Sequence, residues 1–133
     1  MSSALGVDTV QAGSTNSAYA DWEIRATDAT GTVQWELIDE DGVTYNSGAV
    51  TSIQADPHPF KTGLWKFRAE AQIDVPYSIP VNNLGSKYRI KWVLLKDGIE
   101  HYVFDTVHVM PSVSDRLGVV DQVELTDTPV RLA

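Results

Sequence analysis

The sequence contains no cysteine, so neither a disulfide bond nor a thiolate metal site can hold its fold together. It also lacks an apolar run long enough to span a membrane. The residues after Met1 have neither the basic start nor the apolar stretch of a secretory signal. We therefore expect the packing of apolar side chains alone to stabilise the chain, and we expect synthesis and folding in a cytoplasm.

Clustered positive charge is also missing. Ten Lys and Arg residues stand against eighteen Asp and Glu residues, which gives a formal net charge of −8, and the basic residues are scattered singly. Nucleic-acid recognition needs concentrated Lys and Arg, and anionic lipid surfaces repel an acidic chain. We therefore expect neither nucleic acid nor a membrane as a partner.

A sustained helical period is absent from the first 110 residues, whereas alternation at period two is frequent. The longest alternating run covers residues 64–75 and ends before Pro76. Its apolar members are Trp65, Phe67, Ala69, Ala71, Ile73 and Val75. This pattern predicts a half-buried strand of an all-β protein, and 133 residues are enough for one domain.

Further runs predict strands at residues 22–26, 33–37, 43–45, 88–94 and 99–110, with a weak edge strand at Leu5–Val10. Gly42 and the pair Asp97–Gly98 suit hairpin turns, and we expect the sheets to be antiparallel. Gly13–Ser17 reads as a loop, and Asn46–Gly48 as a break or bulge.

One strand does not alternate cleanly. Tyr102, Val103 and Phe104 are consecutive apolar residues near the centre of the segment 99–110. A β-bulge would explain this run, and so would a strand that is buried on both faces.

Two local features resemble the immunoglobulin-like superfamily. Trp35 resembles the core tryptophan of the third strand, and Leu84–Tyr88 resembles the corner where a tyrosine hydroxyl bonds back to the main chain. The resemblance implies an antiparallel β-sandwich of about seven strands over residues 1–111. The chain departs from the superfamily pattern because it lacks the cysteine pair.

The whole chain also resembles small accessory structural proteins of tailed bacteriophage virions, which combine a cysteine-free acidic sandwich with an extended arm. The phrases Val33–Gly42 and Val119–Leu125 are similar to phrases of such domains. This resemblance implies a virion component, made in the host cytoplasm, that decorates the capsid or joins the head-to-tail connector. Its partners would be other virion structural proteins (capsid, portal or tail components), bound in multiple copies.

The last 22 residues, 112–133, predict an arm that does not extend the sandwich pattern. They carry more apolar residues than a free tail exposes to water. Ser112–Asp115 could cap a short helix within the arm. The arm either folds back on its own domain or reaches a neighbouring subunit, by strand addition or by filling a groove. Its candidate partner-binding residues are Leu117, Val119, Val120, Val123 and Leu125.

Catalytic and metal-binding patterns are scarce. The histidines, His58, His101 and His108, do not pair at the spacings of metal ligands. The acidic turn Asp39–Gly42 carries oxygen ligands for calcium but lacks the longer loop and distal glutamate of a dedicated site, so a solvated hairpin turn is the simpler interpretation. No serine lies in a Gly-x-Ser-x-Gly motif. We therefore expect no enzyme, no cofactor and no metal.

Aromatic residues leave a second hypothesis open, a carbohydrate- or receptor-binding module of a tail-associated adhesin. The loop Ala55–Lys61 would form its site. The four tryptophans lie on apolar sides of alternating strands, where core packing is the simpler role; they are Trp22, Trp35, Trp65 and Trp92. The better candidates for exposed contact are Tyr19, Tyr45, Tyr77 and Tyr102.

Overall fold

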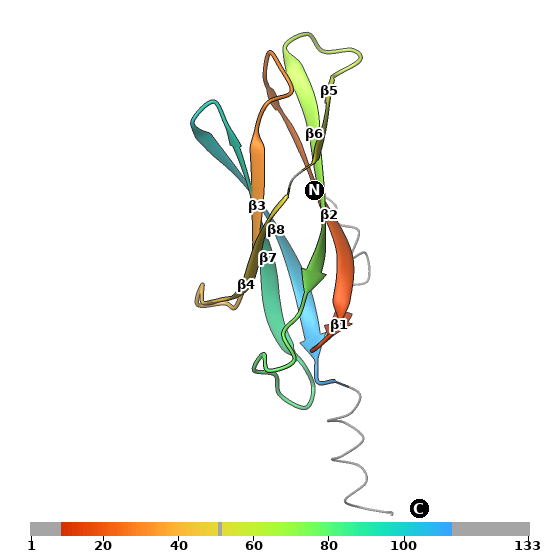
Figure 1. Ribbon diagram of the computed structural model, residues 1–133, viewed down its shortest axis with the longest axis vertical. Coiled ribbons are helices and arrows are strands. Elements are labelled where there is room, and N and C mark those ends of the chain that lie inside the picture. The colour runs from red at the N-terminus through yellow and green to blue at the C-terminus, as the bar shows by residue number, and fades with distance from the viewer. Residues whose placement is uncertain (1–8, 51, 113–133) are drawn as a thin grey trace, which may run out of the picture.

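The computed structural model describes residues 9–50 and 52–112, which form eight strands in two sheets with no helix among them (Figure 1). The strands are β1 Thr9–Gln11, β2 Thr15–Arg25, β3 Thr32–Ile38, β4 Thr44–Val50, β5 Ile53–Pro57, β6 Leu64–Asp74, β7 Ser86–Lys96 and β8 Ile99–Met110. The larger sheet has the order β1-β8-β7-β3-β4 and the smaller one β2-β6-β5. The prediction of an all-β protein is confirmed.

The larger sheet is mixed, so the prediction of purely antiparallel pairing is wrong. β1 runs parallel to β8, with Thr9 opposite His108 and Gln11 opposite Met110. All other pairs are antiparallel. Parallel neighbours need a long connection instead of a tight turn, and β1 and β8 lie near opposite ends of the described chain.

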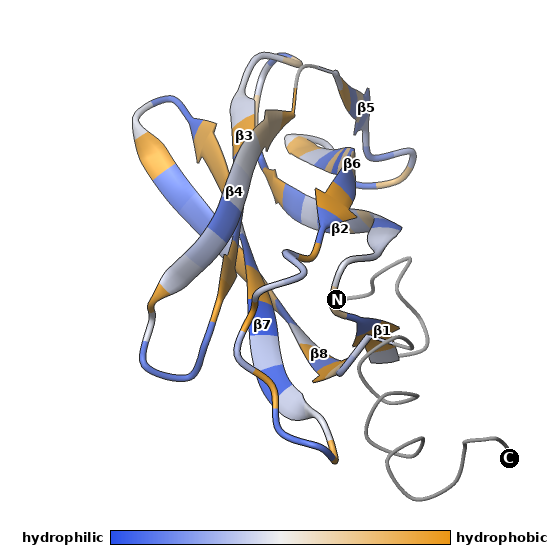
Figure 2. Ribbon diagram, turned by 60° about the horizontal axis from the view of Figure 1, so that its bottom comes forward, coloured by the Kyte–Doolittle hydropathy of each residue, from blue (hydrophilic) through white to orange (hydrophobic). Residues whose placement is uncertain are grey.

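One hydrophobic core joins the two sheets, and hydrophobic and hydrophilic bands alternate along the strands (Figure 2). Trp92 is fully buried, Trp22 and Trp35 are almost so, and Trp65 packs half-buried against the same core. The predicted core role of the four tryptophans is confirmed. The described residues contain no helix long and apolar enough to cross a membrane.

The β3–β4 hairpin differs from its prediction in one detail. β4 continues through Asn46–Gly48, and the register shift lies instead between Leu37 and Ile38, which are both buried. Gly48 stands opposite Trp35, and a Cβ there would lie 2.7 Å from the indole Nε1. The glycine makes room for the ring and does not break the strand.

Two further predictions about irregular segments need correction. The predicted loop Gly13–Ser17 is too long, because β2 already begins at Thr15 and pairs with Asp74 of β6. The segment Ala55–Lys61 is only partly a loop, since residues 55–57 belong to β5, a strand that was not predicted. Both strands bury few large side chains at these ends, so their sequences carry little alternation.

The predicted turns are confirmed, and so is the predicted hydrogen bond from the Tyr88 hydroxyl to the main chain. Asp97 and Gly98 both have positive φ, 52° and 78°, and they join β7 to β8 in two residues. Gly42 also has positive φ, 88°. The buried Tyr88 donates its hydroxyl hydrogen bond to the main-chain carbonyl of Pro80.

Candidate functional site

Apolar and aromatic side chains gather on the outer face of β7 and β8, away from the core. Neither explanation predicted for the run 102–104 holds: the β7–β8 register is regular from Ser86–Val109 to Lys96–Ile99, and the outer side chains of the run are open to solvent. Tyr102 is 49% exposed, Phe104 42% and Leu95 44%. We call this surface the β7–β8 strip; it consists of Arg89, Lys91, Val93, Leu95, Tyr102 and Phe104.

Cross-strand register makes the strip continuous. Val93 stands directly opposite Tyr102, and Lys91 directly opposite Phe104. Side chains of opposite residues in an antiparallel pair lie about 5 Å apart at Cβ, so apolar surface runs across both strands without a gap. Side chains alternate between the two faces of a strand. Asp105, Val107 and Val109 of β8 point inward and are buried, so Tyr102 and Phe104 point outward.

Two cations border the aromatic rings. The Arg89 guanidinium carbon lies 4.9 Å from the Phe104 ring centroid, and the Lys91 ammonium nitrogen lies 4.9 Å from that of Tyr102. Each pair is a cation–π contact that holds the ring and the charge together at the surface. The Tyr102 hydroxyl donates to Glu100, and this hydrogen bond raises the pKa of the phenol. The strip therefore presents fixed aromatic rings bordered by positive charge.

The outer face of the smaller sheet is different, because its polar groups satisfy one another. Arg68 bonds Asp21 through Nε at 2.7 Å and through a terminal nitrogen at 3.1 Å, and its guanidinium lies 4.2 Å from the Tyr19 ring centroid. Gln72 donates to Ser17 at 2.8 Å. Tyr19 is thus half-buried beneath a paired arginine and is a poorer exposed contact than predicted.

The acidic turn is a hairpin turn in which the Asp39 carboxylate accepts hydrogen bonds from the turn itself. Asp39 Oδ1 accepts the main-chain N–H groups of Asp41 at 2.8 Å and Val43 at 2.9 Å, while Oδ2 accepts the Tyr45 hydroxyl at 3.0 Å. These bonds, led by that from Val43, lower the pKa of Asp39. Tyr45 also packs edge-on against Tyr88, so its hydroxyl and ring are both engaged.

The three histidines lie in separate places. His58 Nδ1 accepts the main-chain N–H groups of Phe60 and Lys61, both at 3.1 Å, and its Nε2 lies 3.2 Å from Glu23. His108 Nε2 lies 2.9 Å from the Leu84 carbonyl oxygen. His101 is half-buried on the opposite face of β8. Across residues 9–50 and 52–112, no group of three or more metal-ligating side chains is assembled.

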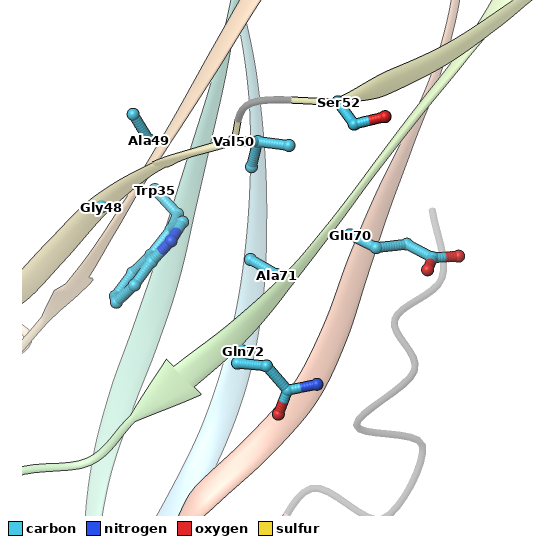
Figure 3. Close-up of a pocket in the computed structure, with 8 residues that line it drawn as sticks. All are labelled: Trp35, Gly48, Ala49, Val50, Ser52, Glu70, Ala71 and Gln72. Carbon is cyan, nitrogen blue, oxygen red and sulfur yellow. The ribbon is translucent and has the colours of Figure 1, made fainter.

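Among the hollows elsewhere on the described part of the chain, two differ in size and lining. The smaller, about 290 Å³, lies between β4 and β6, with Trp35 and Ala71 facing it from the two sheets (Figure 3). The larger, about 640 Å³, lies on the outer face of the smaller sheet beside Pro57 and Pro59. The charged residues that line it are Asp21, Glu23, Asp56, Lys66 and Arg68. Beyond Pro59, Phe60 is 90% exposed at the loop tip.

The candidate residues of the sequence thus meet different outcomes. Tyr77 and Tyr102 are exposed, as predicted, at 59% and 49%. The predicted partner-binding residues Leu117, Val119, Val120, Val123 and Leu125 lie outside the described residues.

Comparison with known proteins adds no relative. No family model and no curated protein sequence matches the chain. The interpretation of the site therefore depends on its geometry.

Sequence reasoning missed the strip, although a signal for it exists. Residues 92–95 and 102–104 are both runs of apolar residues, and the two-residue turn at Asp97–Gly98 sets Trp92 opposite Val103 and Val93 opposite Tyr102. A strand that buries one face needs an apolar residue only at every second position. Consecutive apolar residues on paired strands therefore place apolar side chains on both faces of the sheet.

Proposed function

We propose that this chain is a non-enzymatic interaction domain that docks on other proteins through the β7–β8 strip. The observation that carries the proposal is the exposure of Leu95, Tyr102 and Phe104, at 42–49%, on the face of a sheet whose other face already forms the core. Aromatic side chains and arginine are enriched in the buried centres of protein interfaces. A contiguous apolar surface with these residues is typical of a docking site.

We propose a virion of a tailed bacteriophage as the setting, with the domain as a capsid decoration or a head-to-tail accessory protein in multiple copies. The support is the similarity of Val33–Gly42 and Val119–Leu125 to phrases of such proteins. In that setting the partners are capsid, portal or tail components. A rigid body with one apolar face suits a role that needs many identical contacts and no chemistry.

The fold we propose is immunoglobulin-like. When β1 to β8 are read as A′, B, C, C′, D, E, F and G, the larger sheet has the order A′GFCC′ and the smaller one BED, which follows the strand grouping of that superfamily. The buried Trp35 on the third strand and the Tyr88 hydrogen bond to Pro80 support the same proposal.

A non-enzymatic role fits the way the candidate reactive groups are used. The Asp39 carboxylate binds its own turn, and His58 Nδ1 binds the loop that follows it. Each of these groups therefore stabilises its own turn or loop.

The proposal is tested by site-specific photo-crosslinking in cells that produce the particle. A photoreactive phenylalanine replaces Tyr102 in the strip or, as the matched control, Tyr77, which is 59% exposed between β6 and β7. We expect position 102 to crosslink to a structural protein that co-purifies with particles and position 77 to give at least tenfold less product. Equal yields from both positions, or none from position 102, would overturn the proposal.

A second candidate function is glycan or receptor binding through the β5–β6 loop. Its support is Phe60, which is 90% exposed beside the larger hollow and could stack on a sugar face. A glycan array probed with the whole chain and with Phe60→Ala tests it. Binding that the substitution abolishes would favour this function, whereas no binding above background would remove it.

A further inference from the structure

We propose that the β7–β8 strip of one copy binds residues 117–125 of a second copy, so that copies join head to tail. This inference rests on the proposed function of the strip as a protein-docking surface and names the partner. Three features of the chain carry it: the charge of the strip, the composition of the C-terminal residues, and the place where the described chain ends.

The strip is basic on an acidic chain. In a chain of ten basic and eighteen acidic residues, the strip carries Arg89 and Lys91 at successive outward positions of β7. The next outward residue of that strand, Lys87, pairs with Glu40 at 3.7 Å. Arg89 and Lys91 lie over the exposed rings. A fitting partner therefore carries carboxylates next to apolar side chains.

Residues 117–127 have this composition. They include Asp121, Glu124 and Asp127, and they contain no Lys or Arg. Their apolar members are Leu117, Val119, Val120, Val123 and Leu125. In an extended segment, Val119, Asp121, Val123 and Leu125 would share one face, which would set one carboxylate among apolar side chains. The strip has the complementary mixture of rings, aliphatic groups and cations.

The chain leaves the domain far from the centre of the strip. Tyr102 lies near the β7–β8 turn, whereas β8 ends at Met110, eight residues or about 27 Å further along the strand (Figure 1). Residues 113–133 follow, and 21 residues reach up to about 70 Å when extended. A donor segment of one copy on the strip of another is a heterologous contact, which produces rings or filaments from identical copies. A segment that binds the strip of its own copy instead leaves the chain monomeric.

Complementation between two full-length variants tests the inference. Phe104→Asp disables the strip and leaves the donor segment intact, whereas Val123→Asp disables the donor and leaves the strip intact. We expect the sedimentation-derived mass of the wild-type chain to rise with concentration and each variant alone to remain monomeric. An equimolar mixture of the variants then has one intact interface and forms dimers, which doubles the mass.

A charge exchange provides the second arm of the test. Lys91→Glu is expected to weaken association, and combining it with Asp121→Lys in the same chain is expected to restore it at least in part. Circular dichroism and tryptophan fluorescence of every variant check that the fold is unchanged. Asp56→Asn, on the far sheet, is the control and should leave association as in the wild type.

Several outcomes would overturn the inference. A wild-type chain that stays monomeric at all concentrations would do so, as would a mixture of variants that stays monomeric. If the wild-type chain associates but the mixture of variants stays monomeric, another surface joins the copies. If position 102 nevertheless crosslinks to a different particle protein, the proposed docking function stands and only its assignment to a second copy fails.

Discussion

The ammonium group of Lys96, a residue only 2% exposed, forms an ion pair with the carboxylate of Asp28, which links the end of β7 to the turn between β2 and β3. The ammonium also donates to Thr30 Oγ1 at 3.0 Å. Asp28 in turn accepts the main-chain N–H of Thr30 at 3.0 Å and its hydroxyl at 2.7 Å. One carboxylate therefore organises the turn and neutralises a buried cation.

Unequal effects of substitution are expected at the two ends of this ion pair. Asp28→Asn removes the nearer of the two carboxylates that pair with a buried ammonium and should lower the free energy of unfolding. Lys96→Met removes the charge but keeps an unbranched side chain of similar length, and should be closer to neutral. Urea denaturation measures both, with Asp97→Asn as the control because that carboxylate is 68% exposed and 3.9 Å away. A larger loss for Lys96→Met than for Asp28→Asn would contradict this view.

Titration of the same Asp28 carboxylate should also make the free energy of unfolding depend on pH in the acidic range. The hydrogen bond from Lys96, followed by those from Thr30, lowers the pKa of Asp28 in the folded state. A lowered pKa means that the stabilisation is complete above the unfolded-state pKa of 3.8 and is lost as the pH falls below it. Unfolding midpoints between neutral and acidic pH should therefore fall less steeply for Asp28→Asn than for the wild type. Parallel profiles would refute the assignment.

Gly48→Ala is expected to destabilise the domain by about 1–3 kcal/mol, because the new Cβ overpacks the Trp35 ring. The cost is steric, since Gly48 does not have a positive φ. Ser47→Ala, at the exposed neighbouring position of β4, should change the free energy of unfolding by less than about 0.5 kcal/mol. Chemical denaturation of the two variants compares them, and equal stabilities would show that the ring moves aside freely.

Tyr88→Phe removes the hydrogen bond to the Pro80 carbonyl and should cost about 0.5–1.5 kcal/mol. The matched control is Tyr102→Phe, whose hydroxyl bonds Glu100 at the exposed surface and should contribute little. Thermal unfolding of the two variants separates the effects. If Tyr88→Phe is as stable as the control, the corner hydrogen bond does not support the fold.

Local patterns predicted much of the fold because burial imposes period two on long strands. β3, β6 and β7 carry apolar residues at every second position over most of their length, and their existence was predictable from that pattern. β5 was not, because Ile53 and Ala55 are only half-buried at a sheet edge. The parallel pairing of β1 with β8 joins residues about a hundred positions apart, and no local pattern encodes such a pairing.

The candidate site was harder to predict than the fold. Tyr102 and Phe104 are residue types that also occur in cores, and only the register of β8 against β7 assigns them to the outer face. A shift of one residue would bury them and expose Val103. Sequence periodicity thus predicts that a strand exists, but in an apolar run it does not predict which face of the strand meets solvent.

The central claim, that the β7–β8 strip is a docking surface, is tested most directly by competition for incorporation into particles. Wild type and a Tyr102→Ser/Phe104→Ser double variant are produced in equal amounts in the same cells, and mass spectrometry measures their ratio in purified particles. Truncation of a hot-spot residue, a class in which tyrosine is enriched, costs about 2 kcal/mol or more, so we expect the variant to be depleted at least tenfold while its soluble form remains folded. Equal incorporation of the two proteins would contradict the claim.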